Sequence, residues 1–256
     1  MNIKKEKIVD QLKKLKENGA VAVKAEFEAE GSRKDELIML RELVYQADMR
    51  FIIKIGGCEA VHDLDQCKLL DANGIMAPMI ETPFSMFKFK HAADKVFKED
   101  IHNIEWIINA ETKTCLDNFE SILNEGSDFL NGVTVGRSDL SASLGIKKSE
   151  IESQRVYELT ETFVDMAKKR GFITNFGGNI GVESIPFIKK MSSKIDRFET
   201  RKIVLSAEND AGKLKNNIQD ALRFELMYLD LKSCYYGAMA VEDNVRKERL
   251  KKQIEV

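Results

Sequence analysis

Short apolar segments rich in β-branched residues alternate along the chain with longer charged segments, whose apolar residues recur every three or four positions. Buried strands and amphipathic helices have these two patterns. Strands are expected over residues 20–27, 51–55, 74–79, 106–110, 132–135, 172–175 and 200–205. Helices are expected over residues 34–46, 63–72, 84–96, 115–124, 148–170 and 209–231. Strands and helices that alternate at this spacing form a parallel sheet covered by helices.

A parallel sheet can be open and doubly wound, or it can close into a barrel. A dinucleotide-binding open sheet carries G-x-G-x-x-G after its first strand, whereas the acidic residues 26–31 (EFEAEG) occupy that place here and would repel a phosphate. A barrel instead brings polar residues from several strand ends to one face. The expected strand ends carry Glu26, Glu28, Lys54, Glu81, Asn109, Glu111, Asp139, Asn175 and Arg201. We therefore predict an α/β fold of the TIM-type (β/α)8 class, regular or modified, because only seven strands are recognisable.

One domain is expected to span residues 1–256, because the chain has three prolines and no linker-like segment. Residues 232–256 are rich in Lys, Arg and Glu and are expected to form an added C-terminal helix. The 40 Lys and Arg residues balance 42 Asp and Glu residues, so the net charge of −2 indicates neither nucleic acid nor a membrane as partner. The charged N-terminal segment is unlike a signal peptide, and the four scattered cysteines suggest no disulfide framework. The expected location is cytoplasmic.

The sharpest local motif runs from Gly136 to Gly145 (GRSDLSASLG) at the end of an apolar strand. Gly136 allows a tight exit from the strand, and Ser138 and Asp139 open a helical turn. Asp139 could cap that helix. It could instead bind a metal ion, while the free amides of the new helix hold a substrate carboxylate.

A second strand end carries Asn109 and Glu111, which lie two residues apart and therefore on one face of the strand. Glu111 could simply favour the start of the next helix. In a barrel, however, Glu111 and Asp139 end consecutive strands and come close together. Two carboxylates completed by water and substrate oxygens suit Mg²⁺ or Mn²⁺ better than zinc.

Lys54 ends a third strand and precedes two glycines, where backbone can approach a ligand. Its ammonium group could bind a carboxylate or stabilise a developing oxyanion. It could also form a Schiff base with a carbonyl substrate, or it could extend into solvent.

With these segments the chain resembles the HpcH/HpaI aldolase and citrate lyase β-subunit family of the phosphoenolpyruvate/pyruvate barrel superfamily. The resemblance lies in the motif Gly136–Gly145, in Asn109–Thr112 and in the Pro78-Met79 pair, and it covers residues 20–150 well. It implies a divalent ion held by Glu111 and Asp139, which chelates the carboxylate and keto oxygens of a pyruvate-like acid. The resemblance further implies that the ion would stabilise an enolate while a carbon–carbon bond breaks or forms.

Two positions depart from the pattern of the resembling family. Lys54 takes the place of an arginine that contacts the keto oxygen, and it supplies charge without the planar guanidinium geometry. The stretch Glu26-Phe27-Glu28-Ala29 takes the place of an acidic residue and a histidine that act as the base. Metal-bound water assisted by Glu26 or Glu28 could replace that base, the reaction could differ, or activity could be lost.

Arg137 is a further departure, since the family motif commonly has a small residue or proline there. It could recognise an anionic group of the second substrate, or it could point to solvent. Together with Asn109, Gly136 and Ser138, it completes the expected substrate-binding set.

Three functions are compatible with these residues. The first is a metal-dependent carbon–carbon lyase of the class II aldolase type that acts on a 2-oxo acid, with an aldehyde as second substrate. The second is an acyl-CoA lyase for malyl, citramalyl or citryl thioesters. The third is a catalytically silent barrel that serves as a binding or assembly subunit. The resemblance also implies a homo-oligomer. Residues 231–256 could pack on another subunit of it, or they could instead form a solvated tail.

Overall fold

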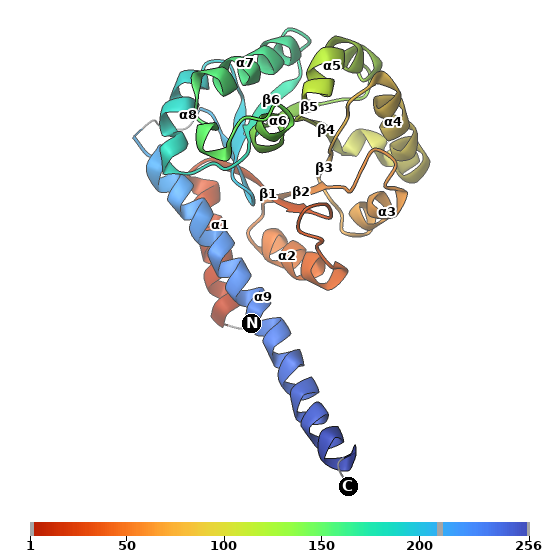
Figure 1. The fold of residues 1–256 in the computed structure, drawn as a ribbon, viewed down its shortest axis with the longest axis vertical. Coiled ribbons are helices and arrows are strands. Elements are labelled where there is room, and N and C mark those ends of the chain that lie inside the picture. Colours follow the sequence, from red (N-terminus) through yellow and green to blue (C-terminus); the bar gives the residue numbers. More distant parts are fainter. Residues whose placement is uncertain (1–2, 209–211, 255–256) are drawn as a thin grey trace.

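The computed structural model describes residues 3–208 and 212–254, and these form a closed eight-stranded barrel surrounded by helices (Figure 1). The strands follow one another around the barrel in chain order, from β1 to β8. They are β1 (Ala20–Glu26), β2 (Arg50–Lys54), β3 (Gly74–Ala77), β4 (Glu105–Ala110), β5 (Gly132–Gly136), β6 (Ile173–Gly177), β7 (Arg197–Glu199) and β8 (Ile203–Ser206). The α/β barrel predicted from the sequence is therefore confirmed.

The last strand makes this a modified barrel. Strands β1 to β7 pair in parallel, but β8 runs antiparallel to both of its neighbours, β7 and β1. A tight turn joins β7 to β8, closed by the Thr200 amide, which donates to the Ile203 carbonyl over 2.9 Å. The strand expected over residues 200–205 is thus partly wrong, because residues 200–202 form the turn and β7 precedes them unpredicted.

Helices cover the outside of the barrel, and most of them follow the strand that they are expected to follow. The α-helices are α1 (Ile3–Glu17), α2 (Lys34–Gln46), α3 (Val61–Leu69), α4 (Pro83–Phe97), α5 (Lys113–Glu125), α6 (Arg137–Ser143), α7 (Gln154–Lys168), α8 (Ile185–Met191) and α9 (Leu214–Ile254). Short 3-10 turns are η1 (Lys98–Asn103), η2 (Lys148–Glu150) and η3 (Val182–Ser184). Their buried apolar faces pack on the outer face of the sheet in one continuous core.

The inside of the barrel is layered, because alternate residues of each strand point inward. Ala22, Ile52, Met76, Ile107 and Val204 form one apolar inner layer. Two residues further along β1, β2 and β4, in the direction of the parallel strands, the inward residues become polar. This second layer contains Lys24, Lys54 and Asn109, and it forms the floor of the cavity described below.

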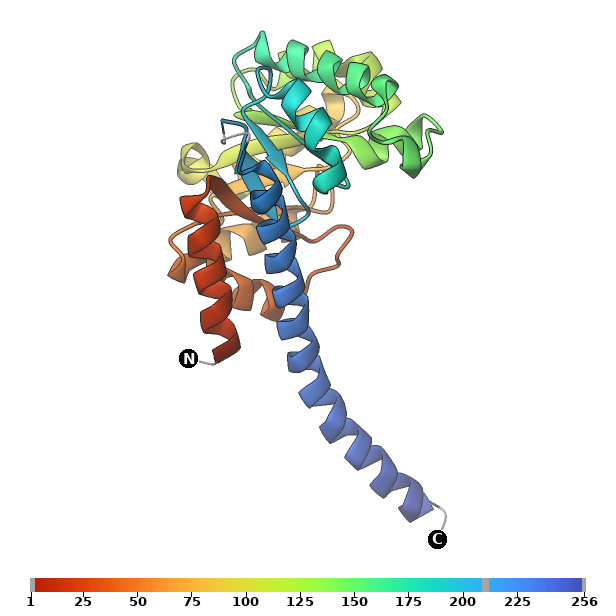
Figure 2. The ribbon, with the colours of Figure 1, turned by 90° about the vertical axis from the view of Figure 1, so that its left-hand side faces the viewer.

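Helix α9 is a single continuous helix, whereas the sequence suggested a helix over 209–231 and a separate extension over 232–256. Residues 209–211, 255 and 256 lie outside the described part of the chain. The helix begins beside β1, where Asn217 donates to the Asn18 carbonyl over 3.0 Å, and it runs alongside α1. Its C-terminal half extends well beyond the barrel (Figure 2).

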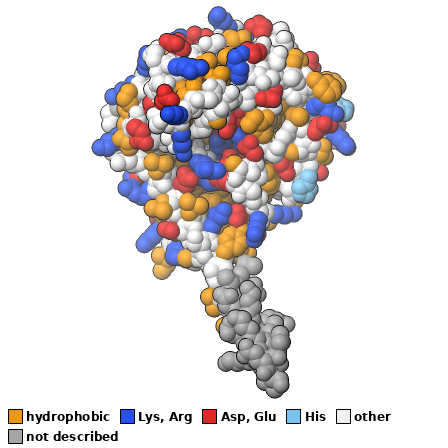
Figure 3. Space-filling model, in the orientation of Figure 1, with side chains coloured by type: hydrophobic (Ala, Val, Ile, Leu, Met, Phe, Trp, Pro, Cys, Tyr) orange, Lys and Arg blue, Asp and Glu red, His pale blue; other side chains and the backbone are white. Residues whose placement is uncertain are grey.

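The surface mixes charges of both signs over the face shown in Figure 3, without a large patch of either sign. This agrees with the near-neutral net charge of the chain. Among the described residues, no helix is both long enough and apolar enough to cross a membrane.

Candidate functional site

A cavity of about 570 Å³ lies at the carboxyl ends of the parallel strands. Its lining includes eight of the nine residues that the sequence indicated as catalytic, substrate-binding or metal-binding, and Arg137 is the exception. The eight are Glu26, Glu28, Lys54, Asn109, Glu111, Gly136, Ser138 and Asp139. The barrel therefore brings together side chains from four strands and from the start of α6, as its topology requires.

Glu111 is the most deeply buried carboxylate of the cavity, with 1% of its surface exposed. It follows β4 and accepts hydrogen bonds from the Met79 amide over 3.1 Å and from Asn109 Nδ2 over 2.8 Å. Burial raises the pKa of the Glu111 carboxyl, and the nearby negative charge of Asp139 adds to the rise, while Lys54 opposes it. The site thus holds a carboxylate whose charge is incompletely compensated by the protein.

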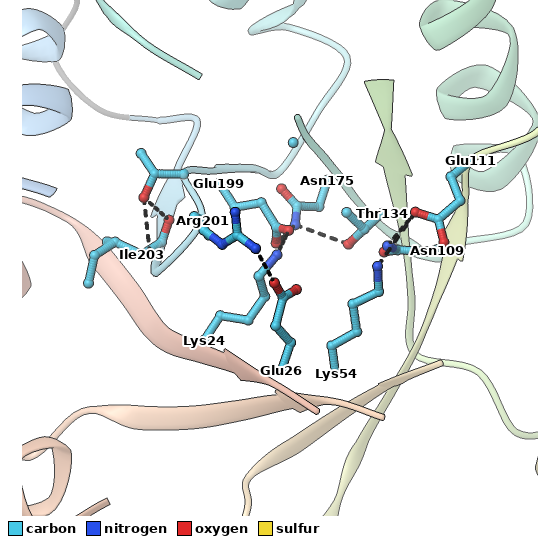
Figure 4. A network of polar contacts seen from close by, with 12 residues as sticks. Lys24, Glu26, Lys54, Asn109, Glu111, Thr134, Asn175, Glu199, Arg201 and Ile203 are labelled. Carbon is cyan, nitrogen blue, oxygen red and sulfur yellow. Dashed lines mark hydrogen bonds and ion pairs between the residues drawn. The ribbon is translucent and has the colours of Figure 1, made fainter. Parts of the chain in front are cut away.

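Lys54 ends β2 and points into the cavity beside Glu111 (Figure 4). Its Nζ lies 2.6 Å from Glu28 Oε2 and 3.7 Å from Glu111 Oε2. Burial lowers the pKa of Lys54, but the negative charges of Glu111, Glu28 and Glu26 outweigh burial and hold it above its ordinary value. Lys54 is therefore an ammonium ion at neutral pH, which suits oxyanion stabilisation and disfavours the free amine that a Schiff base needs.

Both carboxylates that the sequence offered as bases are engaged in ion pairs. Glu28 binds Lys54, as above, and Glu26 Oε1 lies 2.9 Å from Arg201 Nη2. Arg201 belongs to the turn between β7 and β8 and also contacts Glu30, over 3.1 Å. Neither base candidate is free to accept a proton unless its ion pair opens.

The cavity floor holds a buried polar network, of which the sequence indicated only Asn175 (Figure 4). Lys24 of β1 forms an ion pair with Glu199 of β7, and both side chains are almost fully buried. Asn175 of β6 donates to Glu199 Oε2 over 2.7 Å and to Thr134 Oγ1 over 3.0 Å. The alternation of side chains along β1 could have identified Lys24, because it lies two residues before Glu26 and therefore on the same face of the strand.

Two glycines permit close packing beside the acidic pair. A Cβ added at Gly136 would lie 2.6 Å from Glu111 Oε2, so a larger residue there would displace that carboxylate. A Cβ added at Gly178 would lie 2.6 Å from the Ser138 amide nitrogen, and Gly178 has a φ of +92°. Glycine at 178 therefore lets the loop after β6 approach the start of α6 closely, at a φ that disfavours other residues.

Asp139 lies in the first turn of α6, is exposed, and lines the cavity near Glu111. Among the hydrogen bonds of the described residues, none caps α6 through the Asp139 side chain. The helix-cap alternative is therefore not realised.

Arg137 does not face the cavity, which differs from the expectation that it binds substrate. Its side chain is fully buried, and its guanidinium lies 4.4 Å from the centre of the Phe187 ring. It donates to both carboxylate oxygens of Glu152 and to the carbonyls of Gly177 and Gly178. Arg137 thus fixes the loop after β6 against α6, and we exclude it from the proposed site.

Replacing Arg137 with methionine is expected to lower the free energy of unfolding by about 3 kcal/mol, because Glu152 and two loop carbonyls lose a buried charged donor. Urea unfolding followed by circular dichroism measures the change. An unchanged urea midpoint would contradict the conclusion that Arg137 fixes the loop after β6 against α6. Arg155, an exposed arginine at the start of α7, provides a matched control as Arg155→Met.

The residues fit a divalent cation at Glu111 and Asp139. Asn109 turns its Nδ2 toward Glu111, and its buried Oδ1 accepts no hydrogen bond from the described residues. The carboxylates of Glu111 and Asp139 repel each other, and hard divalent cations prefer oxygen donors of this kind. The described residues contain no cluster of three or more His, Cys, Asp or Glu side chains that would bind an ion alone. An ion here would therefore need water or substrate oxygens as well.

Fold and site together define a (β/α) barrel with an acidic polar cavity at the carboxyl ends of its strands. The chain belongs to the HpcH/HpaI aldolase/citrate lyase family, whose model matches residues 19–178. A comparison with curated proteins gives no match.

Solved structures share the fold at low sequence identity. An HpcH/HpaI aldolase/citrate lyase family protein from Burkholderia cenocepacia J2315 is 14% identical, with a TM-score of 0.62, over 75% of this chain and 82% of that one. The HpcH/HpaI aldolase from Desulfitobacterium hafniense DCB-2 is 17% identical, with a TM-score of 0.61, over 84% and 87%. The citrate synthase SbnG is 16% identical, with a TM-score of 0.60, over 87% and 90%.

Proposed function

We propose that this protein is a divalent-metal-dependent carbon–carbon lyase that acts on a 2-oxo acid through the enolate of pyruvate. Membership of the HpcH/HpaI aldolase/citrate lyase family supports a lyase. The observation that carries the finer proposal is the buried Glu111 carboxylate beside Asp139, whose negative charges disfavour each other. A divalent cation would compensate both charges at once.

The roles of the residues follow from their positions. Glu111 and Asp139 would hold Mg²⁺ or Mn²⁺, which supplies a Lewis acid for the enolate oxygen. Lys54 presents a fixed positive charge beside Glu111, where it can stabilise the same developing oxyanion. The Ser138 amide belongs to the first turn of α6 at the cavity wall, where it can donate to the substrate carboxylate.

The two polar side-chain atoms of Asn109 have different roles. Its Nδ2 donates to Glu111 and so orients that carboxylate, while its Oδ1 remains available as an acceptor. We propose that Oδ1 accepts a hydrogen bond from a substrate hydroxyl or from a water molecule in the cavity. Asn109 is thus proposed to orient both the ion site and the substrate.

Proton exchange at the methyl group of pyruvate tests the proposal. We expect exchange with deuterium oxide in the presence of Mg²⁺ or Mn²⁺, measured by proton NMR, and its loss when a chelator removes the ion. Lack of exchange with either ion in folded protein would contradict the proposal. Cleavage of a malyl-type CoA thioester without pyruvate exchange would favour the acyl-CoA lyase, and ion binding without either reaction would favour a silent barrel.

A further inference from the structure

The reaction proposed above needs a group that transfers a proton to or from the second half of the substrate. Most carboxylates of the cavity are unsuited to this task. Glu26, Glu28 and Glu199 are held in ion pairs by Arg201, Lys54 and Lys24. Glu111 and Asp139 are assigned to the ion. Another carboxylate must therefore be sought among the residues that line the cavity.

Glu225 lies on helix α9 and lines the same cavity. It is half-buried, and among the side chains that the structure describes no hydrogen bond or ion pair engages its carboxylate. Glu183 also lines the cavity but is exposed to solvent. Glu225 is thus the carboxylate that combines partial burial with a free proton-accepting group.

The barrel core fixes the position of Glu225. The preceding Phe224 is fully buried, and Tyr228, one helical turn later, is buried and donates to the Glu36 carbonyl over 3.3 Å. These anchors on either side hold the intervening turn of α9 against the barrel. Glu225 can therefore act from a fixed place, as a proton-transfer group requires.

The charged groups around Glu225 come from the end of β1 and from the turn between β7 and β8. Burial raises the pKa of the Glu225 carboxyl, and the negative charges of Glu30 and Glu26 add to the rise. The positive charges of Lys202 and Arg201 oppose it. A carboxyl whose pKa lies above its ordinary value is better matched to proton transfer near neutrality.

Glu225 and the proposed ion site lie on opposite sides of the barrel. Glu111 and Asp139 follow the adjacent strands β4 and β5, whereas Glu225 faces charged groups near β8 and β1. In a closed ring of eight strands, these two pairs of neighbours are diametrically opposed. A substrate whose 2-oxo acid end binds at the acidic pair can therefore extend across the shared cavity toward Glu225.

We propose that Glu225 is the catalytic acid and base for the aldehyde half of the substrate, an inference that rests on the function proposed above. In cleavage of a 4-hydroxy-2-oxo acid, the ionised carboxylate accepts the proton of the C4 hydroxyl while the C3–C4 bond breaks. The electron pair of that bond remains with the pyruvate half as its enolate, and C4 leaves as an aldehyde. In bond formation, the protonated Glu225 returns the proton to the aldehyde oxygen.

The variant Glu225→Gln tests this assignment, because glutamine has nearly the same size and cannot exchange a proton at neutral pH. The full-length chain is assayed with Mn²⁺ for pyruvate proton exchange and for condensation of pyruvate with glycolaldehyde and with glyceraldehyde. Condensation is expected to fall by about 10²-fold or more, while pyruvate exchange and Mn²⁺ affinity stay within twofold of the wild type. The matched control Asp230→Asn, at an exposed position of the same helix, is expected to leave both reactions unchanged.

The pH dependence gives a second readout. Cleavage of the condensation product needs ionised Glu225, so its rate should decrease as the pH falls through the raised pKa, and Glu225→Gln should lack this dependence. Glu225→Asp, which keeps the carboxyl group, should retain it at a reduced rate and serves as the test if the glutamine variant fails to fold.

The possible outcomes separate this inference from the proposed function. Unchanged condensation in Glu225→Gln would overturn the assignment, and so would an equal loss of exchange and condensation. Exchange without condensation in the wild type, with both aldehydes, would overturn the assignment while the enolate chemistry stands. Absence of exchange in the wild type would instead refute the proposed function, and the inference with it.

Discussion

Replacing Glu111 with glutamine is expected to abolish measurable Mn²⁺ binding and to lower pyruvate proton exchange by about 10²- to 10³-fold. The substitution removes one of the two negative charges that the ion needs and leaves only the exposed Asp139. Isothermal titration calorimetry measures the affinity for Mn²⁺, and proton NMR measures the exchange. Retention of both at wild-type levels would refute the ion site.

The same substitution should leave the fold intact. Glutamine keeps an oxygen that can accept from the Met79 amide, and Lys54 retains its ion pair with Glu28. Because burial raises the pKa of Glu111, its ionised form destabilises the folded state above that pKa. At pH 7 the free energy of unfolding should therefore change by less than about 1 kcal/mol or increase slightly. A large loss of stability would mean that Glu111 is mainly structural.

Replacing Lys54 with methionine is expected to lower the free energy of unfolding by about 3–5 kcal/mol at neutral pH. The change leaves the deeply buried Glu111 without its compensating cation, and Glu28 without its partner. Pyruvate exchange should fall by about 10²- to 10³-fold in the same variant, because the charge beside the enolate oxygen is lost. Urea unfolding and the NMR exchange assay measure the two effects.

The pH dependence of the stability of the Lys54→Met variant tests whether the uncompensated charge of Glu111 causes the loss. The pKa of Lys54 is raised in the folded state, so its charge stabilises the wild type throughout the neutral range and is lost only in strong alkali. Without that charge, Glu111 should protonate more readily, and the deficit in stability should shrink as the pH falls from 8 to 5. The double variant Lys54→Met/Glu111→Gln should recover most of the stability. A deficit that does not vary with pH would indicate lost packing instead.

The local pattern of hydrophobic and polar residues was sufficient to predict the helices and strands that alternate regularly along the chain. Helix α2 has the predicted bounds, because its apolar period is clear over residues 34–46. Strand β7 escaped prediction because it has only three residues, of which Arg197 and Glu199 are charged. These charges are satisfied inside the barrel by partners from distant strands, such as Glu105 for Arg197 over 2.6 Å. The pattern of hydrophobic and polar residues along the sequence does not identify such distant partners.

The site residues also divide into those that the local sequence pattern predicts and those that only the three-dimensional fold brings to the cavity. Glu111, Asn109 and Lys54 were recognisable because each ends an apolar strand, and a barrel brings such ends to one cavity. Glu225 was not recognisable, because only the path of α9 across the closed barrel brings it to the cavity. Arg137 was assigned to the substrate because it lies within the Gly136–Gly145 motif, yet the helix start turns it toward Phe187. The direction of a side chain at a helix start depends on tertiary packing, and the spacing of residues in the sequence does not determine that packing.

The reversed direction of β8 also bears on how the molecule folds. The hairpin of β7 and β8 spans residues 197–206 and consists of local contacts, which form rapidly. Its pairing with β1, near the other end of the chain, is by contrast a contact of very long sequence separation and is intrinsically slow. We therefore expect a nascent chain to keep the outer edge of β1 unpaired until residue 206 has left the ribosome. Ring closure, and with it the meeting of Arg201 with Glu26, would then be a late event in biosynthesis.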